Sequence, residues 1–214
     1  MLFSKNIFDL VKRKEKKRIL FILSGGKSVK EPYKFLSNLN IEWKNSEAVL
    51  VDERISKKKE YLNESVLNKF FFKKKAKNVK FLRYEFKNEI NRKFFYRLKK
   101  KLVSSFSIAI IGFGNDGHIA SIFKKMNNFS SIVNSKKMPK IIMTEKIGKP
   151  HLKRVSFNLS MILLSDIIYL IIGNKKKLNF LKNINRNKIS PLYHLIKSKK
   201  NVIYIYKNRI YNLK

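Results

Sequence analysis

One segment of this chain carries most of the residue types that could do chemistry. Four apolar residues, 108–111, run directly into a stretch with three glycines, an aspartate and a histidine, Gly112-Phe113-Gly114-Asn115-Asp116-Gly117-His118. Glycines let the backbone leave a strand through φ values that other residues avoid. At the carboxyl end of a buried strand His118 would face a ligand pocket, where an imidazole can exchange a proton near neutral pH. The sequence therefore predicts His118 as an acid–base residue.

Three further segments place glycines or charged residues directly after a predicted strand. They are Ser24-Gly25-Gly26, Asp52-Glu53-Arg54, and Gly173 with Lys175-Lys176-Lys177 after it. In a parallel sheet the carboxyl ends of the strands share one edge, so all three segments can converge with His118 on one cleft. Glycine N–H groups and cations at such an edge suit an anionic ligand. A solvated turn at 52–54 and a solvated lysine run at 175–177 are alternatives that the sequence leaves open.

Two nucleotide-binding motifs are matched only in part. Gly26-Lys27-Ser28 resembles the end of a Walker A loop, but Phe21 stands where that motif requires its first glycine. The three glycines of 112–118 fit the dinucleotide pattern G-x-G-x-x-G. That pattern requires a long helix directly afterwards, whereas the segment 119–123 is short and polar residues follow it. The sequence therefore argues against both an NTPase and a dinucleotide-binding enzyme.

The chain is strongly basic, with 50 lysines and arginines against 14 aspartates and glutamates and a formal net charge of +36. Such a balance raises the question of nucleic-acid binding. The lysines, however, are spread along the whole chain and form no single stripe, which favours solvated lysine-rich faces over a dedicated nucleic-acid surface. A positive surface also attracts anionic small molecules. No specific nucleic-acid partner is expected.

Composition also bears on the location of the protein. The chain contains no cysteine, which excludes disulfides and thiolate metal sites and fits a cytoplasmic location. It has no apolar run long enough to span a bilayer, and residues 1–17 lack the apolar core of a signal peptide. Phe3, Ile7, Leu10 and Val11 have helical spacing. We expect this helix to pack on a sheet, and the alternative is a basic amphipathic helix on a membrane surface.

Predicted strands alternate with predicted helices along the whole chain. Strands are expected at 18–23, 48–51, 79–82, 108–111, 140–144, 166–172 and 202–206, and an edge strand at 154–159. Helices are expected from residue 29 or 30, from a capping Asn63 to about 72, at 88–103, from 175 and from 191. This alternation predicts an α/β fold over 1–214: a single three-layer domain with a mostly parallel, Rossmann-like sheet covered by helices on both faces.

These motifs, in this order, resemble those of the 6-phosphogluconolactonases. The matching segments are Ser24-Gly25-Gly26, Asp52-Glu53-Arg54 with Asn63, residues 112–123, Arg154-Val155-Ser156, and Gly173 with Lys176. The resemblance extends from about residue 18 to residue 206. Its most specific part is 112–123, which has the pattern Gly-x-Gly-x-Asp-Gly-His-x-Ala-Ser-x-Phe. The resemblance implies one α/β domain related to the glucosamine-6-phosphate deaminases.

The resemblance also implies a reaction and a set of site residues. The substrate would be a small sugar-phosphate lactone, 6-phosphoglucono-δ-lactone, opened by hydrolysis in the oxidative pentose phosphate pathway. His118 would be the catalytic base, with Asp116 and Asp52 orienting it or the sugar hydroxyls. The phosphate would be bound by Ser24, Gly25, Gly26, Arg54 and Lys176. No metal, cofactor or membrane partner is expected, and the protein would be a monomer or a weak homodimer.

Two other functions stay open. Glucosamine-6-phosphate deaminases share Asp-Gly-His-Ile-Ala, present here as residues 116–120, but they continue with Phe-Asn-Glu-Pro, whose glutamate serves the ring-opening chemistry. Here Ser121-Ile122-Phe123 follows, which favours the lactonase over a sugar-phosphate isomerase of the deaminase type. The second alternative is a degenerate, non-catalytic member of the family that binds partners through its basic surface.

Overall fold

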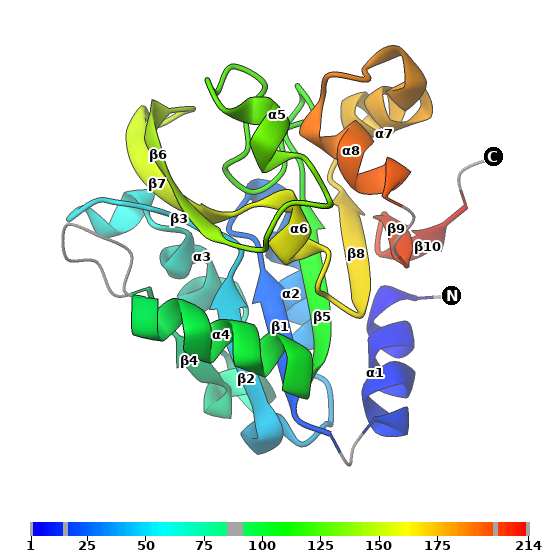
Figure 1. The fold of residues 1–214 in the computed structure, drawn as a ribbon. Helices are drawn as coiled ribbons and strands as arrows, with labels where there is room; N and C mark the ends of the chain where they lie inside the picture. Colours follow the sequence, from blue (N-terminus) through cyan, green and yellow to red (C-terminus); the bar gives the residue numbers. More distant parts are fainter. Residues whose placement is uncertain (1, 15–16, 85–91, 199–200, 213–214) are drawn as a thin grey trace.

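The computed structural model describes residues 2–14, 17–84, 92–198 and 201–212, and its centre is a seven-stranded sheet (Figure 1). The strands follow the order β10-β9-β8-β5-β1-β2-β4, and all neighbours are parallel except β9 and β10. Their bounds are β1 Ile19–Leu23, β2 Ser46–Leu50, β4 Lys80–Leu82, β5 Phe106–Gly112, β8 Ile167–Ile172, β9 Val202–Tyr206 and β10 Arg209–Tyr211. The mostly parallel α/β sheet expected from the sequence is confirmed.

The middle of this sheet consists of strands with continuous apolar runs. All residues of β1 are buried, as are all residues of β5 before Gly112. A strand that is apolar on both sides requires cover on both faces of the sheet. The register pairs Leu23 of β1 with Leu50 of β2 and with Ile110 of β5. The three strands therefore reach the same edge, and the segments that follow them begin side by side.

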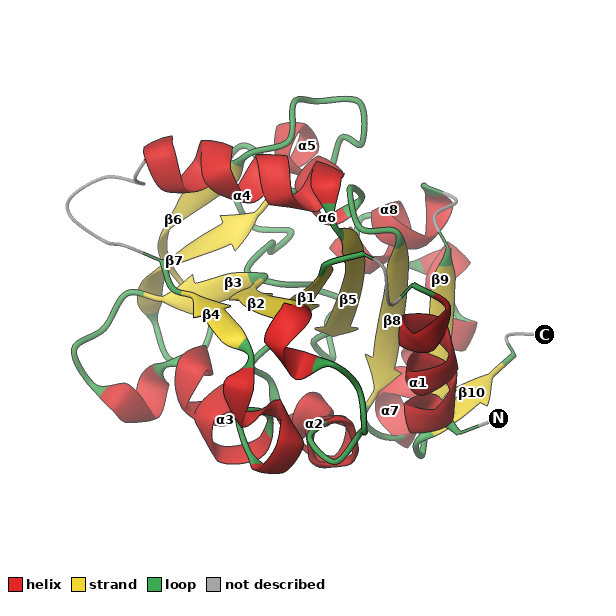
Figure 2. Cartoon of the chain, turned by 90° about the horizontal axis from the view of Figure 1, so that it is seen from below, coloured by secondary structure: helices red, strands yellow, loops and turns green. Residues whose placement is uncertain are grey.

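Helices supply the cover on both faces. One face packs against α1 (Phe3–Arg13), α2 (Lys30–Leu36) and α3 (Asn63–Phe70). The other packs against α4 (Arg92–Ser104), α6 (Leu159–Ile162) and α8 (Pro191–Lys197). Figure 2 shows α2 and α3 on one side of the strands and α4 and α6 on the other. The expected three-layer arrangement is thus present, with α5 (Phe129–Ile132) and α7 (Lys175–Lys182) near the edge that carries the site.

A second, antiparallel sheet of three strands, in the order β3-β7-β6, stands beside the first. Its strands are β3 Asp52–Arg54, β6 Ile141–Ile147 and β7 Leu152–Phe157. Residues 52–54 are therefore a strand and not a solvated turn. The strand expected at a sheet edge over 154–159 is instead β7, which has a partner on each side. Because β3 follows β2 after a single residue, the chain passes directly from the large sheet to the small one.

The amphipathic segment at the start of the chain packs on the large sheet, as expected. Phe3, Ile7 and Val11 of α1 are buried in the core of that face. The Phe3 ring lies edge-on to the ring of Tyr169 in β8, with 5.2 Å between the ring centres. Apolar burial of this kind accounts for the helix without a membrane surface. Among the described residues, no helix is both long and apolar enough to cross a bilayer.

One local expectation differs from the structure, one strand was not expected, and one expected helix lies partly outside the described residues. The side chain of Asn63 does not cap α3; the backbone N–H groups of Asn63 and Glu64 donate instead to the carboxylate of Glu53. Strand β10 was not predicted, because three residues give too short a pattern, but Lys207 and Asn208 turn the chain into it with positive φ angles of 47° and 61°. Residues 88–91 of the helix expected at 88–103 lie outside the described residues.

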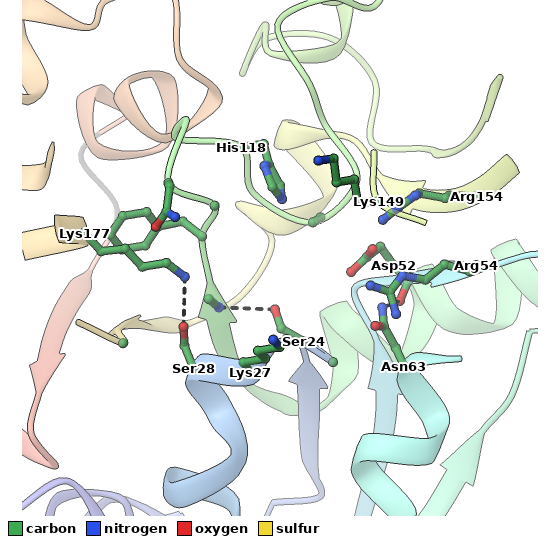
Figure 3. Close-up of a pocket in the computed structure, with 18 of the residues that line it drawn as sticks. Ser24, Lys27, Ser28, Asp52, Arg54, Asn63, His118, Lys149, Arg154 and Lys177 are labelled. Carbon is green, nitrogen blue, oxygen red and sulfur yellow. Dashed lines mark hydrogen bonds between the residues drawn. The ribbon is translucent and has the colours of Figure 1, made fainter. Parts of the chain in front are cut away.

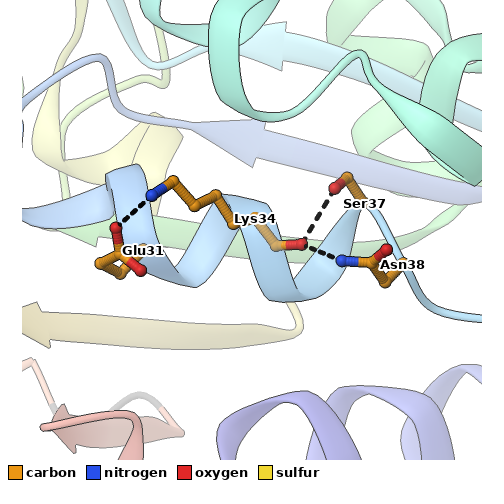
Figure 4. A network of polar contacts seen from close by, with 4 residues as sticks. All are labelled: Glu31, Lys34, Ser37 and Asn38. Carbon is orange, nitrogen blue, oxygen red and sulfur yellow. Dashed lines mark hydrogen bonds and ion pairs between the residues drawn. The ribbon is translucent and has the colours of Figure 1, made fainter.

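Helix α2 carries polar contacts within it and at its carboxyl end (Figure 4). The Lys34 ammonium lies 2.6 Å from the Glu31 carboxylate. At the carboxyl end the Lys34 carbonyl accepts hydrogen bonds from Ser37 Oγ at 2.9 Å and from Asn38 Nδ2 at 2.7 Å, which satisfies a carbonyl that the helix leaves free. From the middle of the helix the Tyr33 hydroxyl donates to the Ser24 carbonyl at 2.6 Å. Helix α2 therefore holds the glycine loop that precedes it.

Candidate active site

A cavity of about 600 Å³ lies where the strands of both sheets end (Figure 3). This volume is in the usual range for a small-molecule site. The lining residues come from all four segments that the sequence singled out, together with residues of the small sheet and its hairpin. They are Ser24, Gly25, Gly26, Lys27, Ser28, Asp52, Arg54, Asn63, Gly112, Phe113, Gly114, Asn115, His118, Ala120, Lys149, Arg154, Gly173, Asn174 and Lys177.

The loop of residues 24–28 forms one side of this cavity, which we call the cleft floor (Figure 3). Ser24 Oγ accepts a hydrogen bond from the Gly112 N–H at 3.3 Å and thereby ties the loop to β5. The N–H groups of Gly25 and Gly26 make no hydrogen bond within the described part of the chain. A Cβ atom on Gly25 would lie 2.2 Å from the Asn63 side chain, so this position needs a glycine. The floor thus offers free backbone donors to an anion.

His118 lies across the cavity from the floor, and we call its side, with Lys149 and Arg154, the cleft roof (Figure 3). The loop that carries His118 is closed by a hydrogen bond of 2.8 Å from the Gly114 N–H to the His118 carbonyl. Gly117 has a φ of +79°, which other residues rarely adopt. A Cβ on Gly114 would lie 2.2 Å from the imidazole. The glycines of this segment therefore shape the loop around the histidine ring.

Asp116 orients that ring. Its Oδ1 atom lies 2.6 Å from His118 Nδ1, and this hydrogen bond lowers the pKa of Asp116 to about 2. An ionised carboxylate at Nδ1 favours the tautomer that carries its proton there. The Nε2 atom is then left with a free lone pair, as a general base requires. Asp116 is not itself among the cavity-lining residues, so its contact with the ring is its route to the chemistry.

A phenyl ring supports the imidazole from one side. The rings of His118 and Phe123 are stacked, with 4.3 Å between their centres and 30° between their planes. The Arg154 guanidinium lies over the same phenyl ring, 5.6 Å from its centre. Arg154 is only 4% exposed, and burial, together with the nearby Arg54, lowers its pKa. His118 and Arg154 are therefore linked through one aromatic side chain.

Asp52, Arg54 and Asn63 form one flank of the cavity (Figure 3). Asp52 is buried and accepts a hydrogen bond of 2.6 Å from the hydroxyl of Ser121. Asn63 Nδ2 donates to the Asp52 carbonyl at 2.8 Å, and Arg54 Nη1 donates to the Tyr61 carbonyl at 2.9 Å. Asn63 Oδ1 and Arg54 Nε are buried with no hydrogen-bond partner among the described residues. A ligand bound in the cavity would supply the missing hydrogen-bond partner of each of these two atoms.

Glu53 lies behind this flank and anchors it. Its carboxylate accepts hydrogen bonds from the backbone N–H groups of Arg54 and Asn63, at 2.7 Å each, and of Glu64 at 2.8 Å. Burial nevertheless raises the pKa of Glu53 to about 7, because desolvation outweighs those bonds and nearby Asp52 adds to the rise. Glu53 thereby fixes the start of α3 and the direction of β3 at the cavity.

Lys177 forms the opposite flank, at the start of α7. Its ammonium donates to Ser28 Oγ at 2.9 Å and lies 5.4 Å from the centre of the Phe113 ring. Burial lowers the pKa of Lys177, while Asp116 partly opposes this shift. Lys176, which the sequence assigned to the phosphate, is exposed and does not line the cavity. The first turn of α7 directs Lys177, and not Lys176, into the cavity. The expectation that Lys176 lies at the site is therefore wrong, and Lys177 lies there instead.

The charges of the cavity identify the kind of ligand it suits. The lining holds three lysines and two arginines but one carboxylate, Asp52. The described residues form no salt bridge from Arg54, Arg154 or Lys177 to a carboxylate. They also contain no cluster of three or more His, Asp and Glu side chains that could hold a metal ion. The cavity therefore favours an anionic small molecule bound by backbone N–H groups and cations.

Sequence reasoning assigned no role to several residues that the structure brings to the cavity. The clearest are Ser28, Lys149, Arg154 and Lys177. A signal existed for Arg154, because Arg154-Val155-Ser156 is one of the segments that resemble the family, although that resemblance gave the arginine no role. Lys177 belongs to the lysine run 175–177 that the sequence placed at this edge, but nothing in the sequence separated it from Lys175 and Lys176, and no signal marked Lys149.

Comparison with known proteins gives a consistent picture. The model of the family described as glucosamine-6-phosphate isomerases/6-phosphogluconolactonase matches residues 3–204. A 6-phosphogluconolactonase of Thermotoga maritima is 25% identical over 195 residues, 89% of this chain and 86% of that protein. One of Neisseria meningitidis is 28% identical over 172 residues, 78% and 74% of the two chains.

Solved structures of the same kind share the fold. The structure of a 6-phosphogluconolactonase from Plasmodium vivax is similar with a TM-score of 0.76, at 21% identity, over 96% of this chain and 86% of that one. A monomeric glucosamine-6-phosphate deaminase is similar with a TM-score of 0.70, at 18% identity, over 96% and 91%. The architecture is therefore common to two chemistries, and the choice between them depends on the residues of the cavity.

Proposed function

The chain belongs to the family of glucosamine-6-phosphate isomerases and 6-phosphogluconolactonases, and we propose that it hydrolyses 6-phosphoglucono-δ-lactone to 6-phosphogluconate in the oxidative pentose phosphate pathway. One observation carries this proposal: an imidazole oriented by Asp116 faces a floor of free glycine N–H groups across a cationic cavity. The floor suits the phosphate of such a lactone, and the imidazole suits the activation of water at its ester carbon.

The phosphate would lie on the cleft floor. The N–H groups of Gly25 and Gly26 and the hydroxyl of Ser24 are its donors, and Arg54 and Lys177 reach it from the two flanks. Arg54 adds planar, forked donors, whereas Lys177 adds a compact charge. Binding of the phosphate holds the lactone ring under the roof, so that its carbonyl carbon is oriented toward His118.

Hydrolysis would then proceed by general base catalysis. His118 Nε2 takes a proton from water as the water oxygen attacks the lactone carbonyl carbon. The C1–ring oxygen bond breaks in the tetrahedral intermediate, and the imidazolium returns its proton to the ring oxygen. Asp116 stabilises the imidazolium through Nδ1, and Asp52 faces the sugar hydroxyls. Such base catalysis contributes about 10²–10⁴-fold to the rate.

The deaminase alternative rests on the shared fold and on residues 116–120. Its reaction uses a glutamate three residues after that block, and the equivalent position here is Phe123, whose ring packs on His118. A phenyl ring cannot exchange a proton, which favours lactone hydrolysis.

The test is a pair of assays on the purified protein, one for lactone hydrolysis with spontaneous opening subtracted and one for deamination of glucosamine 6-phosphate. We expect hydrolysis alone, and we expect His118→Ala to remove it while the protein stays folded. His194→Ala, whose ring lies outside the cavity, is the matched control. Deamination in place of hydrolysis would refute the proposal, as would salt-sensitive DNA binding without either activity.

A further inference from the structure

Arg154 is a buried cation whose environment in the protein is incomplete. The residue is 4% exposed, and the described residues provide no carboxylate within ion-pair distance of its guanidinium. Its Nε donates to the Ile147 carbonyl at 3.1 Å and its Nη2 to the Pro150 carbonyl at 3.0 Å. Its Nη1 makes no hydrogen bond within the described part. The negative charges of Asp52 and Glu53 act on Arg154 from beyond ion-pair distance and only partly oppose the effect of burial on its pKa. A buried cation without a directly paired anion is costly, so a bound anion would stabilise it.

The hairpin between β6 and β7 is shaped to hold this guanidinium at the cavity. Gly148 has a φ of +74°, and a Cβ atom there would lie 2.7 Å from Arg154 Nη2 and 3.0 Å from the Phe123 ring. The neighbouring Lys149 lines the cavity as well. With Nε and Nη2 bound to carbonyls of the hairpin, the Nη1 side of the fork is the part left for a ligand.

Arg154 also shares its end of the cavity with the general base. Phe123 contacts the His118 ring and the Arg154 guanidinium alike. Figure 3 shows both side chains on the roof, opposite Ser24 and Ser28 on the floor. A ligand whose phosphate lies on the floor therefore presents its far end to His118 and Arg154 together.

We propose that Arg154 binds the C1 end of the ligand, stabilising the oxyanion formed when water attacks the lactone and then holding the carboxylate of 6-phosphogluconate. This inference rests on the proposed function. It gives one buried arginine the role of binding the negatively charged groups that the reaction forms at C1. The lactone carbonyl is neutral, and the tetrahedral intermediate carries one negative charge on that oxygen. Its collapse gives a carboxylic acid, which loses a proton to water and becomes the carboxylate of the product. A fixed cation at this point favours the charged species over the substrate.

The assignment predicts recognition of a carboxylate that is separate from recognition of the phosphate. The experiment measures binding of two compounds by calorimetry: 6-phosphogluconate, and glucitol 6-phosphate, which has a hydroxymethyl group in place of the carboxylate. For Arg154→Gln we expect binding of 6-phosphogluconate to weaken about 10- to 100-fold, the usual value of a charged hydrogen bond, and binding of glucitol 6-phosphate to change less than about threefold. Arg54→Gln should weaken both compounds alike.

Lys153→Gln is the matched control, since it removes one positive charge from an exposed position next to Arg154. It should change neither affinity. Thermal unfolding of each variant checks the fold, and Arg154→Lys, which keeps the charge and the stem, replaces the glutamine variant should that one unfold; its loss should again be confined to 6-phosphogluconate. Equal weakening of both compounds, or weakening of neither, would overturn the role of Arg154. If the unaltered protein binds neither compound and hydrolyses no lactone, the proposed function itself fails and this inference fails with it.

Discussion

Asp116 and His118 are two residues apart in one loop, and their side chains face each other, with 2.6 Å between Oδ1 and Nδ1. The Asp116 carboxylate also accepts a hydrogen bond from the His118 backbone N–H at 3.3 Å. The same carboxylate thus fixes the backbone and the ring of the histidine. A single aspartate therefore sets both where the imidazole lies and which nitrogen faces the cavity.

Asp116→Asn should lower kcat strongly and KM little. The amide leaves the geometry similar but no longer favours a proton on Nδ1 or stabilises the imidazolium, and we expect a loss of about 10²-fold or more in kcat. Initial rates of lactone hydrolysis, corrected for spontaneous opening, measure it. Asp9→Asn in α1, which removes one negative charge outside the cavity, controls for the change of charge. Unchanged kcat in Asp116→Asn would show that the contact has only a structural role.

The pKa of Asp116 gives this contact a pH signature. Its folded-state pKa of about 2 lies below the ordinary value of 3.8, so its contribution to stability is present above pH 4 and is lost as the pH falls toward 2. Asp116→Asn removes that part of the acid dependence. Unfolding by urea at pH 2, 3, 4 and 5 measures the effect as a difference between the variant and the unaltered protein. Parallel curves for the two proteins would contradict the ionised Asp116–His118 contact.

Much of this architecture follows from local sequence features. β1, β5 and β8 are apolar runs that end at glycines or serines, and those features predict both the strands and the edge at which the site lies. Segments such as 52–54 could not be assigned in this way. Three charged residues in a row are typical of a solvated turn. They form a strand here because β7, about 100 residues later in the chain, pairs with them.

The composition of the site shows the same division. His118 and the glycines of the floor could be predicted, because a glycine loop after a buried strand lies at the edge where open α/β sheets bind ligands. The choice among Lys175, Lys176 and Lys177 was not, since all three follow the same strand and only the rotation of α7 decides which one faces Ser28. The position of a segment after a strand therefore predicts which loop lies at the site, whereas the rotation of the helix determines which of its side chains enters the cavity.

Replacing the two neighbouring lysines separately tests this correction. Lys177→Gln should raise KM about tenfold or more, because the variant loses a half-buried cation next to Ser28, whereas Lys176→Gln, on the exposed face, should change KM less than twofold. Both variants remove one positive charge, so the total charge of the protein cannot explain a difference between them. A larger effect at Lys176 would restore the residue that the sequence pattern indicated.

Glu53 predicts a second pH dependence of opposite sign. Its folded-state pKa of about 7 lies above the ordinary value of 4.5, so the folded protein binds the proton more tightly than the unfolded chain. Stability therefore falls as the pH rises from about 4.5 to 7, by at most about 1.4 kcal/mol per pH unit for one group. Glu53→Gln should abolish that slope, although it also removes an acceptor from the N–H groups that begin α3. Urea unfolding between pH 4.5 and 8 measures the slope, and Glu64→Gln, at a half-buried neighbour in α3 that pairs with Arg83, should leave it in place.

The position of Phe123 predicts that its side chain, which has no polar atom, affects the rate of lactone hydrolysis. Phe123→Leu removes the ring that stacks on His118 and lies under Arg154, so both side chains lose a support at the roof. We expect kcat to fall about 10- to 100-fold with little change in KM, because small displacements of a catalytic group are costly while the phosphate contacts on the floor persist. Phe129→Leu removes a similarly half-buried ring outside the cavity, and it should lose about as much stability without loss of kcat. If the two variants lose kcat equally, stability and not the ring stack explains the effect; if only Phe123→Leu loses it, the stack holds the base over the lactone.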